Sequence, residues 1–134
     1  MLQRKMGIRV GVLIAGAALF AALVVPVALG RSSAAPSPKD LAAGKSTFVS
    51  TCGACHKLAK AGTVGTIGPD LGKIKPPLTT ATLTKAITLG GAKVMTKAQL
   101  AKYQTQMTPY KGVLSTKQIL QVAQYIASVT GAKS

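Results

Sequence analysis

The chain has 134 residues, of which 17 are Lys or Arg and only 2 are Asp or Glu, so its net charge at neutral pH is +15. It contains two cysteines and one histidine, and this argues against a structural zinc site, which needs four ligands. The excess of positive charge favours acidic partners over neutral ones, with nucleic acid as the alternative.

The N-terminal segment predicts a membrane helix or a signal peptide. Residues 1–9 carry three basic side chains, and residues 10–30 are a run of 21 uncharged residues. A signal peptide has an apolar core of about 7–15 residues and a membrane span needs about 20, so length favours an uncleaved signal-anchor with a cytoplasmic N-terminus. Pro26 and the small residues Ala28 and Gly30 instead fit a cleavage site. With either outcome, the rest of the chain lies outside the cytoplasm, held at the cytoplasmic membrane or released as a periplasmic or secreted protein.

Residues 31–38, RSSAAPSP, have the composition of a linker. Eight residues in an extended, proline-biased form span at most roughly 25 Å. We therefore expect residues 1–30 to be the signal-anchor or signal peptide and residues 39–134 to form the folded domain, close to the membrane if the anchor is retained.

The domain is expected to open with a helix. Ser37 can cap its N-terminus, Pro38 fits its first position, and Asp40 fits its first turn. Apolar or small residues then recur at helical spacing on one face, at Leu41, Gly44, Phe48 and Cys52. This helix leads directly into the one motif that contains reactive side chains.

That motif lies in 51-TCGACHKLAK-60, which contains Cys52, Cys55 and His56. A redox dithiol would belong beside a βαβ pattern, and no such pattern is visible. A zinc site would lack ligands, since only Asp40 and Asp70 remain to complete it. C-x-x-C-H is also the attachment motif of a c-type haem, in which the thiols form thioethers and the histidine binds iron. This third interpretation is the one whose requirements the sequence meets.

Further along the chain, the Gly- and Pro-rich residues 61–77 predict a loop, and no strand alternation appears. A short helix is expected over residues 80–89. Its inward side chains would be Leu83, Ala86 and Ile87, and Gly90 and Gly91 would end it.

Two methionines lie inside the domain and could serve as a second ligand to haem iron. Met95 precedes 96-TKAQL-100, which reads as a capping box, and this gives Met95 the role of a hydrophobic staple against Leu100. Met107 lies in 103-YQTQMTPYKG-112, where Pro109 and Gly112 predict an extended loop. Met107 is therefore the favoured ligand, and ordinary core packing is the alternative role for it.

The last helix is predicted by a second capping box at Ser115 and Gln118 and by a terminal Gly131. Its apolar stripe consists of Ile119, Val122, Tyr125, Ile126 and Val129. A glycine inside a helix costs about 1 kcal/mol relative to alanine. We therefore expect Gly44 to permit close approach between the first and last helices.

From Asp40 onward the chain resembles the small monohaem class I cytochromes c. The matching segments are 44-GKSTFVSTCGACH-56, 68-GPDL-71, 107-MTPYKG-112 and 118-QILQVAQYIASV-129. The resemblance implies one covalent haem c on Cys52 and Cys55, with His56 and Met107 as axial ligands. It also implies that the carbonyl of Pro69 accepts a hydrogen bond from the His56 ring.

The expected fold class is thus all-α, the cytochrome c fold preceded by the N-terminal transmembrane or signal helix. The expected function is that of a one-electron carrier between respiratory-chain components of the membrane, not that of an enzyme. Its partners would be acidic redox proteins such as an oxidase or reductase subunit, and the domain would be monomeric. Scattered lysines argue against nucleic acid. The alternative function is a haem-based ligand binder or small catalyst with an open sixth coordination site.

Overall fold

The computed structural model describes residues 35–103 and 105–132, which belong to one compact unit, Ser32–Ser134. The predicted signal-anchor or signal peptide, residues 1–30, lies outside the described residues. Within the described ranges no helix is long and apolar enough to cross a membrane. The boundaries predicted for the N-terminal segment and the linker stay predictions.

The first helix begins as predicted and ends in an unexpected way. Helix α1 spans Pro38–Thr47, and the Ser37 hydroxyl accepts a hydrogen bond of 3.1 Å from the backbone N–H of Asp40. After Thr47 the helix widens into a π-helical segment, Phe48–Cys52. Single π-helical turns occur frequently at functional sites. Here the segment leads directly into the C-x-x-C-H motif.

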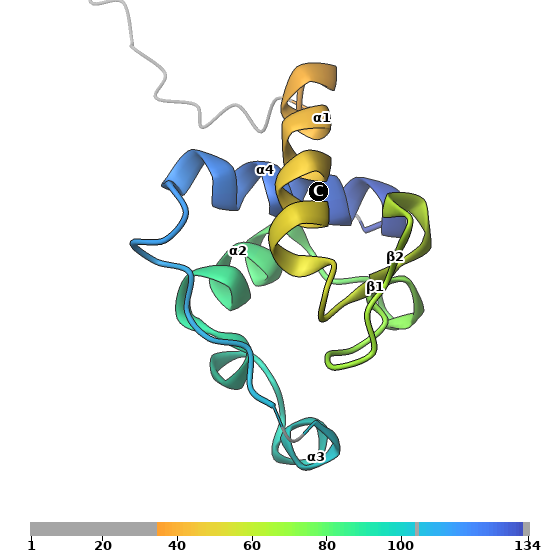
Figure 1. Ribbon diagram of the computed structural model, residues 1–134, viewed down its shortest axis with the longest axis vertical. Coiled ribbons are helices and arrows are strands. Elements are labelled where there is room, and N and C mark those ends of the chain that lie inside the picture. The colour runs from red at the N-terminus through yellow and green to blue at the C-terminus, as the bar shows by residue number, and fades with distance from the viewer. Residues whose placement is uncertain (1–34, 104, 133–134) are drawn as a thin grey trace, which may run out of the picture. The chain divides into compact units, whose positions relative to one another are not determined.

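Helix α4 spans Thr116–Thr130 and crosses α1, as Figure 1 shows. The predicted capping box is present at its start, and Gly131 ends it with φ 76°. Where the helices cross, a Cβ atom on Gly44 would overlap the backbone carbonyl of Gln121. The Phe48 and Tyr125 rings lie beside this contact, with centroids 6.3 Å apart. The expected close approach at Gly44 is therefore confirmed.

A polar contact joins the same two helices. The side chain of Gln121 is buried, and its amide donates a 2.8 Å hydrogen bond to the Asp40 carboxylate at the start of α1. Hydrogen bonds from Ser37 and then Gln121 lower the pKa of Asp40. The carboxylate thus links the N-terminal cap of α1 to the middle of α4.

Replacing Gly44 with alanine tests this crossing. Helix propensity alone would make alanine stabilising by about 1 kcal/mol. The added Cβ must instead displace backbone of α4, so we expect a net loss of about 1–3 kcal/mol in the free energy of unfolding. Denaturant titration measures it, and Ala42→Gly, at an exposed position of α1, is the control that reports propensity alone. A stabilised Gly44→Ala variant would contradict the observed contact.

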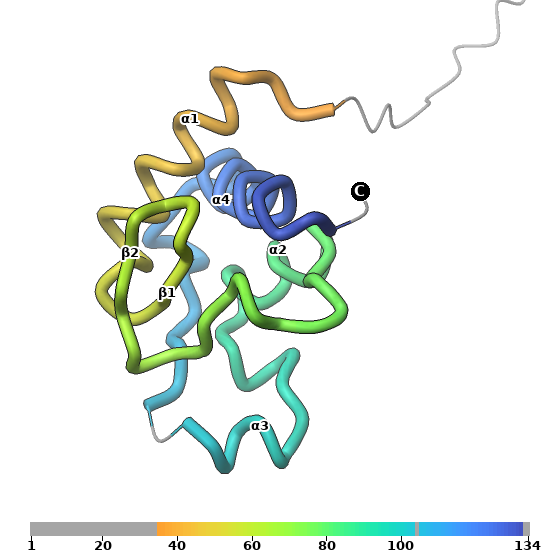
Figure 2. Tube along the Cα trace, turned by 90° about the vertical axis from the view of Figure 1, so that its right-hand side faces the viewer, coloured from red at the N-terminus to blue at the C-terminus, as the bar shows by residue number. Residues whose placement is uncertain are grey.

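The middle of the chain holds two further helices. Helix α2 spans Thr80–Leu89 with Leu83, Ala86 and Ile87 buried, and Gly90 ends it with φ 90°. Helix α3 spans Lys97–Lys102, with the predicted capping box between Thr96 and Gln99. Figures 1 and 2 both show α3 at the end of the domain away from the α1–α4 crossing.

The expectation of an all-α domain missed a small hairpin after the motif. Strands β1, Lys57–Leu58, and β2, Thr63–Val64, pair antiparallel, with Leu58 opposite Thr63. The Thr63 hydroxyl accepts from the Leu58 N–H at 3.0 Å and donates to the His56 carbonyl at 2.8 Å. Two-residue strands are too short to show alternation in the sequence. The domain is mainly helical, and the hairpin fixes the backbone that follows His56.

The hydrophobic core is small and lies between α1, α2 and α4. Its most completely buried side chains are Phe48, Leu58 and Val122. Two residues of the inner face of α4, Val122 and Ile126, also line a large cavity. The core is therefore one wall of that cavity.

Candidate functional site

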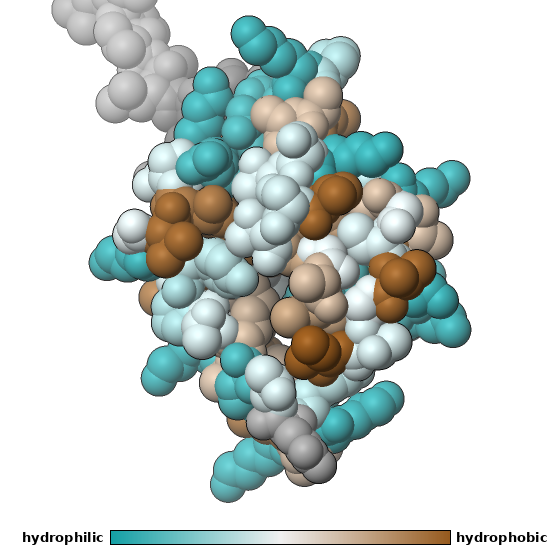
Figure 3. Space-filling model, viewed as in Figure 1, coloured by the Kyte–Doolittle hydropathy of each residue, from teal (hydrophilic) through white to brown (hydrophobic). Residues whose placement is uncertain are grey.

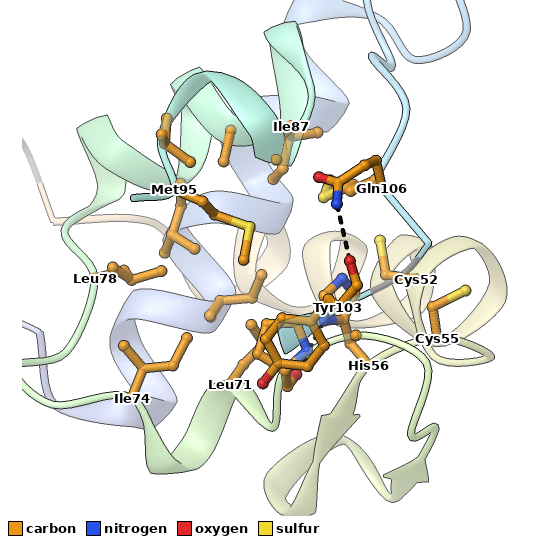
Figure 4. Close-up of a pocket in the computed structure, with 18 of the residues that line it drawn as sticks. Cys52, Cys55, His56, Leu71, Ile74, Leu78, Ile87, Met95, Tyr103 and Gln106 are labelled. Carbon is orange, nitrogen blue, oxygen red and sulfur yellow. Dashed lines mark hydrogen bonds between the residues drawn. The ribbon is translucent and has the colours of Figure 1, made fainter. Parts of the chain in front are cut away.

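The cavity has a volume of about 550 Å³, within the range of roughly 300–1,000 Å³ that suits a cofactor-sized ligand. Figure 4 shows side chains from several segments converging on it. Its apolar walls include Leu71, Ile74, Leu78, Leu83, Ile87 and Ile126. The loop predicted over residues 61–77 supplies the first two of these walls.

The C-x-x-C-H motif forms a tight turn at one end of the cavity. The backbone N–H groups of Cys55 and His56 both donate to the carbonyl of Cys52, at 3.0 and 2.9 Å. Both thiols and the imidazole line the cavity, and Figure 4 shows Cys52 and Cys55 together on one side of it. The turn thus places two thiols and one imidazole at the same cavity.

The His56 ring is held by the segment 68-GPDL-71. Its Nδ1 donates a 3.0 Å hydrogen bond to the Pro69 carbonyl, which can only accept, so Nδ1 carries the proton. Nε2 is then left with a lone pair for a metal ion. A Cβ on Gly68 would stand 2.5 Å from the ring carbon Cε1, so this position needs glycine. The hydrogen bond is the one that the family resemblance implied.

The Cys52 thiol does not have the character of a reactive redox cysteine. Burial, with a smaller contribution from Cys55, raises the pKa of Cys52 to about 11. Catalytic C-x-x-C pairs need a thiol whose pKa is lowered, because the thiolate is the nucleophile. Among the described residues, moreover, no three His, Cys, Asp or Glu side chains are grouped so as to hold a metal ion. Both results leave haem attachment as the interpretation that fits the motif.

Met107 lies in an extended segment and lines the cavity, partly buried against the core. Its carbonyl accepts a 3.1 Å hydrogen bond from the N–H of Gly91, and the N–H of Tyr110 donates to the Ile87 carbonyl at 2.9 Å. These two hydrogen bonds attach residues 107–110 to the C-terminal end of α2 and to Gly91, which follows it. The structure therefore brings Met107 into one cavity with Cys52, Cys55 and His56.

Met95 is the residue whose position the sequence did not indicate. The capping box that it precedes is present, but Met95 itself lines the cavity, and Figure 4 shows its side chain pointing inward. A Cβ on Gly91 would lie 3.5 Å from the Met95 sulfur and 3.2 Å from the Met107 Cβ. Val94 also lines the cavity. In the sequence, the only sign of this was that two apolar residues, Val94 and Met95, stand together between α2 and α3.

A porphyrin fits this set of residues. Apolar walls suit its two faces, the imidazole suits iron, and two thiols on one side suit covalent attachment along one edge. Two further features agree with such a ligand. The Cys52 thiol is buried and neutral, and Gly68 leaves room for the His56 ring.

Comparisons with known proteins agree with this arrangement. The family model described as "Cytochrome c" matches residues 41–130. Among solved structures, the chain is similar to the crystal structure of the c-type cytochrome SorU from Sinorhizobium meliloti. The two share 27% sequence identity with a TM-score of 0.53, over 72% of this chain and 97% of that one. No match was found among curated proteins.

Proposed function

Because the chain belongs to the cytochrome c family, we propose that it carries single electrons between redox proteins at the cytoplasmic membrane, as part of a respiratory chain. The general part of this function comes with the family: the chain has the cytochrome c fold and binds one covalent c-type haem as an electron carrier. The respiratory setting, the partners and the roles of individual residues are our proposal.

The bound haem supplies an iron atom that alternates between the ferrous and ferric states. Cys52 and Cys55 would hold the porphyrin through two thioethers, and His56 Nε2 would bind the iron. The Pro69 carbonyl keeps the His56 ring in the required tautomer and orientation. The observation that carries this proposal is the convergence of both thiols and the oriented imidazole on one apolar cavity.

We assign the second axial position to Met107, which would make the site that of a carrier. Two backbone hydrogen bonds, to Ile87 in α2 and to Gly91 just after it, hold the segment that contains Met107. Met107 lines the cavity from this extended segment. A bound thioether raises the reduction potential and closes the iron to outside ligands. The alternative function, a haem-based ligand binder or small catalyst, requires a labile or open sixth position.

Charge supports acidic redox proteins as partners. From Arg31 onward 14 basic residues stand against 2 acidic ones, a net charge of +12 before any contribution from haem carboxylates. All twelve lysines in the described ranges are exposed. On the face of the domain that Figure 3 draws, strongly hydrophobic residues form separate spots among hydrophilic ones. Docking would therefore be steered by charge more than by one broad apolar patch.

Localisation enters the proposal through residues 1–30. If that segment is retained as an anchor, the linker of residues 31–38 holds the haem domain beside the outer face of the cytoplasmic membrane. If it is cleaved, the domain diffuses as a periplasmic or secreted carrier. Both forms have the same electron-transfer chemistry and differ in how they find a partner.

A salt series tests the docking proposal. For the fragment that starts at Arg31, the bimolecular rate of electron transfer to an acidic partner should fall steeply between about 10 and 150 mM salt, as the screening length shrinks from about 30 to 8 Å. In membranes with an anchored full chain the rate should depend less on salt, since tethering replaces steering by high effective concentration. Flat responses in both preparations would contradict docking through the basic surface. Mature protein that begins near Arg31 in the soluble fraction would rule out the anchor.

A further inference from the structure

His56 is held at three points by three different parts of the chain. Its backbone N–H donates to the Cys52 carbonyl at 2.9 Å, and its ring Nδ1 donates to the Pro69 carbonyl at 3.0 Å. Its own backbone carbonyl accepts a 2.8 Å hydrogen bond from the Thr63 hydroxyl. The first two partners are main-chain atoms. Of these three hydrogen bonds, the one from Thr63 is therefore the one that a substitution of the partner's side chain removes directly.

The Thr63 hydroxyl acts as donor and acceptor at the same time. Its proton goes to the His56 carbonyl, which can only accept, and its oxygen accepts a 3.0 Å hydrogen bond from the backbone N–H of Leu58. Thr63 and Leu58 are both buried. Loss of the hydroxyl would therefore leave the Leu58 N–H and the His56 carbonyl without this partner at a place that water reaches poorly.

The hairpin that contains Thr63 also packs against the two residues between the cysteines. A Cβ atom on Gly53 would lie 2.6 Å from the Thr63 methyl carbon, and one on Gly65 would lie 2.6 Å from the Ala54 carbonyl oxygen. Figure 2 shows the hairpin beside the segment that follows α1. Residues 63–65 thus lie directly against the C-x-x-C-H turn, and the Thr63 hydroxyl has little freedom to move away from it.

We propose that Thr63 is a positioning residue for the iron ligand: its hydroxyl fixes the His56 backbone, so that the ring keeps its hydrogen bond to Pro69 and its orientation in the cavity. This inference rests on the proposed function, because it needs His56 to bind haem iron. Thr63 does not itself line the cavity, so it acts through His56 and not by contact with a ligand. Without the bond from Thr63, the peptide that follows His56 would rotate and the ring would move with it.

Such positioning has a measurable effect on the iron. An acceptor for the ring N–H makes a metal-bound imidazole more basic, and a more basic ligand favours ferric over ferrous iron. Loss of a direct partner of this kind typically costs about 10–100-fold in metal affinity or activity. Thr63 acts through the backbone and not on the ring itself. We therefore expect loss of its hydroxyl to weaken the preference for ferric iron by about threefold to tenfold, less than loss of a direct partner.

The test compares two pairs of full-length proteins, and within each pair the hydroxyl at position 63 is present or absent. Wild type and Thr63→Val both keep a methyl group against Gly53, and Thr63→Ser and Thr63→Ala both lack it. Thr66→Val is the matched control, because Thr66 is exposed and lies in the same segment. Intact mass first establishes that each protein carries covalent haem. The measurements are the reduction potential and the haem-methyl proton shifts of the ferric protein, which depend on the orientation of the imidazole plane.

We expect Thr63→Val and Thr63→Ala to have higher potentials than their hydroxyl-bearing partners, by about 30–60 mV at about 59 mV per tenfold change, together with altered methyl shifts. Thr63→Ser and Thr66→Val should match wild type. If Thr63→Val does not accumulate, the comparison of Thr63→Ser with Thr63→Ala decides the question. Reduced stability with unchanged potential and shifts would make Thr63 a structural residue only and overturn this inference alone. Wild type without covalent haem, or with iron not bound by His56, would overturn the proposed function.

Discussion

Replacing Met107 with alanine should abolish the visible absorption band that marks sulfur bound to ferric haem iron, and should lower the reduction potential, because methionine ligation raises it. The physical reason is that the thioether would be the second axial ligand, presented by a loop fixed to Gly91 and Ile87. A visible spectrum and a redox titration measure both effects.

Met95→Ala is the matched control, since Met95 lines the same cavity and lies close to Gly91 as well. It should keep the band and lose about 1–3 kcal/mol in the free energy of unfolding through packing alone. If Met95→Ala loses the band and Met107→Ala keeps it, the ligand role passes to Met95. A high-spin spectrum in the wild-type protein would instead favour the ligand binder or catalyst with an open sixth position.

Replacing His56 with alanine should prevent folded holoprotein from accumulating. Without haem, the apolar walls of the cavity of about 550 Å³, which include Leu71, Ile74 and Ile126, would face water instead of a bound ligand. A domain is usually stable by only about 5–15 kcal/mol. Haem is therefore expected to supply much of the core as well as the redox chemistry.

Far-UV circular dichroism and haem absorbance of the purified protein measure this loss. Lys57→Ala changes the next residue, which is exposed, and should leave both signals at wild-type levels. A folded His56→Ala domain with native helix content would show that the polypeptide is stable without its axial ligand.

Helix boundaries could be predicted from the sequence because capping is local. Ser37, Thr96 and Ser115 each cap a helix as expected, and Gly90 and Gly131 end two of them. The haem motif was recognisable for the same reason, since its spacing lies within a single turn. Residues 1–30 lie outside the described residues, so the anchor stays a prediction.

Other features depend on contacts between distant segments, and sequence patterns do not report these. The π-helical segment before Cys55 and the hairpin that holds the His56 carbonyl are examples. The inward position of Met95 is another example. An apolar side chain suits a hydrophobic staple and a cavity wall equally well, so the sequence does not distinguish the two roles. The position of Lys75 at the cavity is a third, because the sequence does not distinguish it from the other lysines scattered along the chain.

Covalent attachment of haem at Cys52 and Cys55 is the central claim, and the intact mass of the protein tests it most directly. After extraction with acidified acetone, the polypeptide should retain its colour, and its mass should exceed that of the chain by one haem, with no free thiol left to alkylate. A colourless polypeptide of unmodified mass with two reactive thiols would contradict the claim.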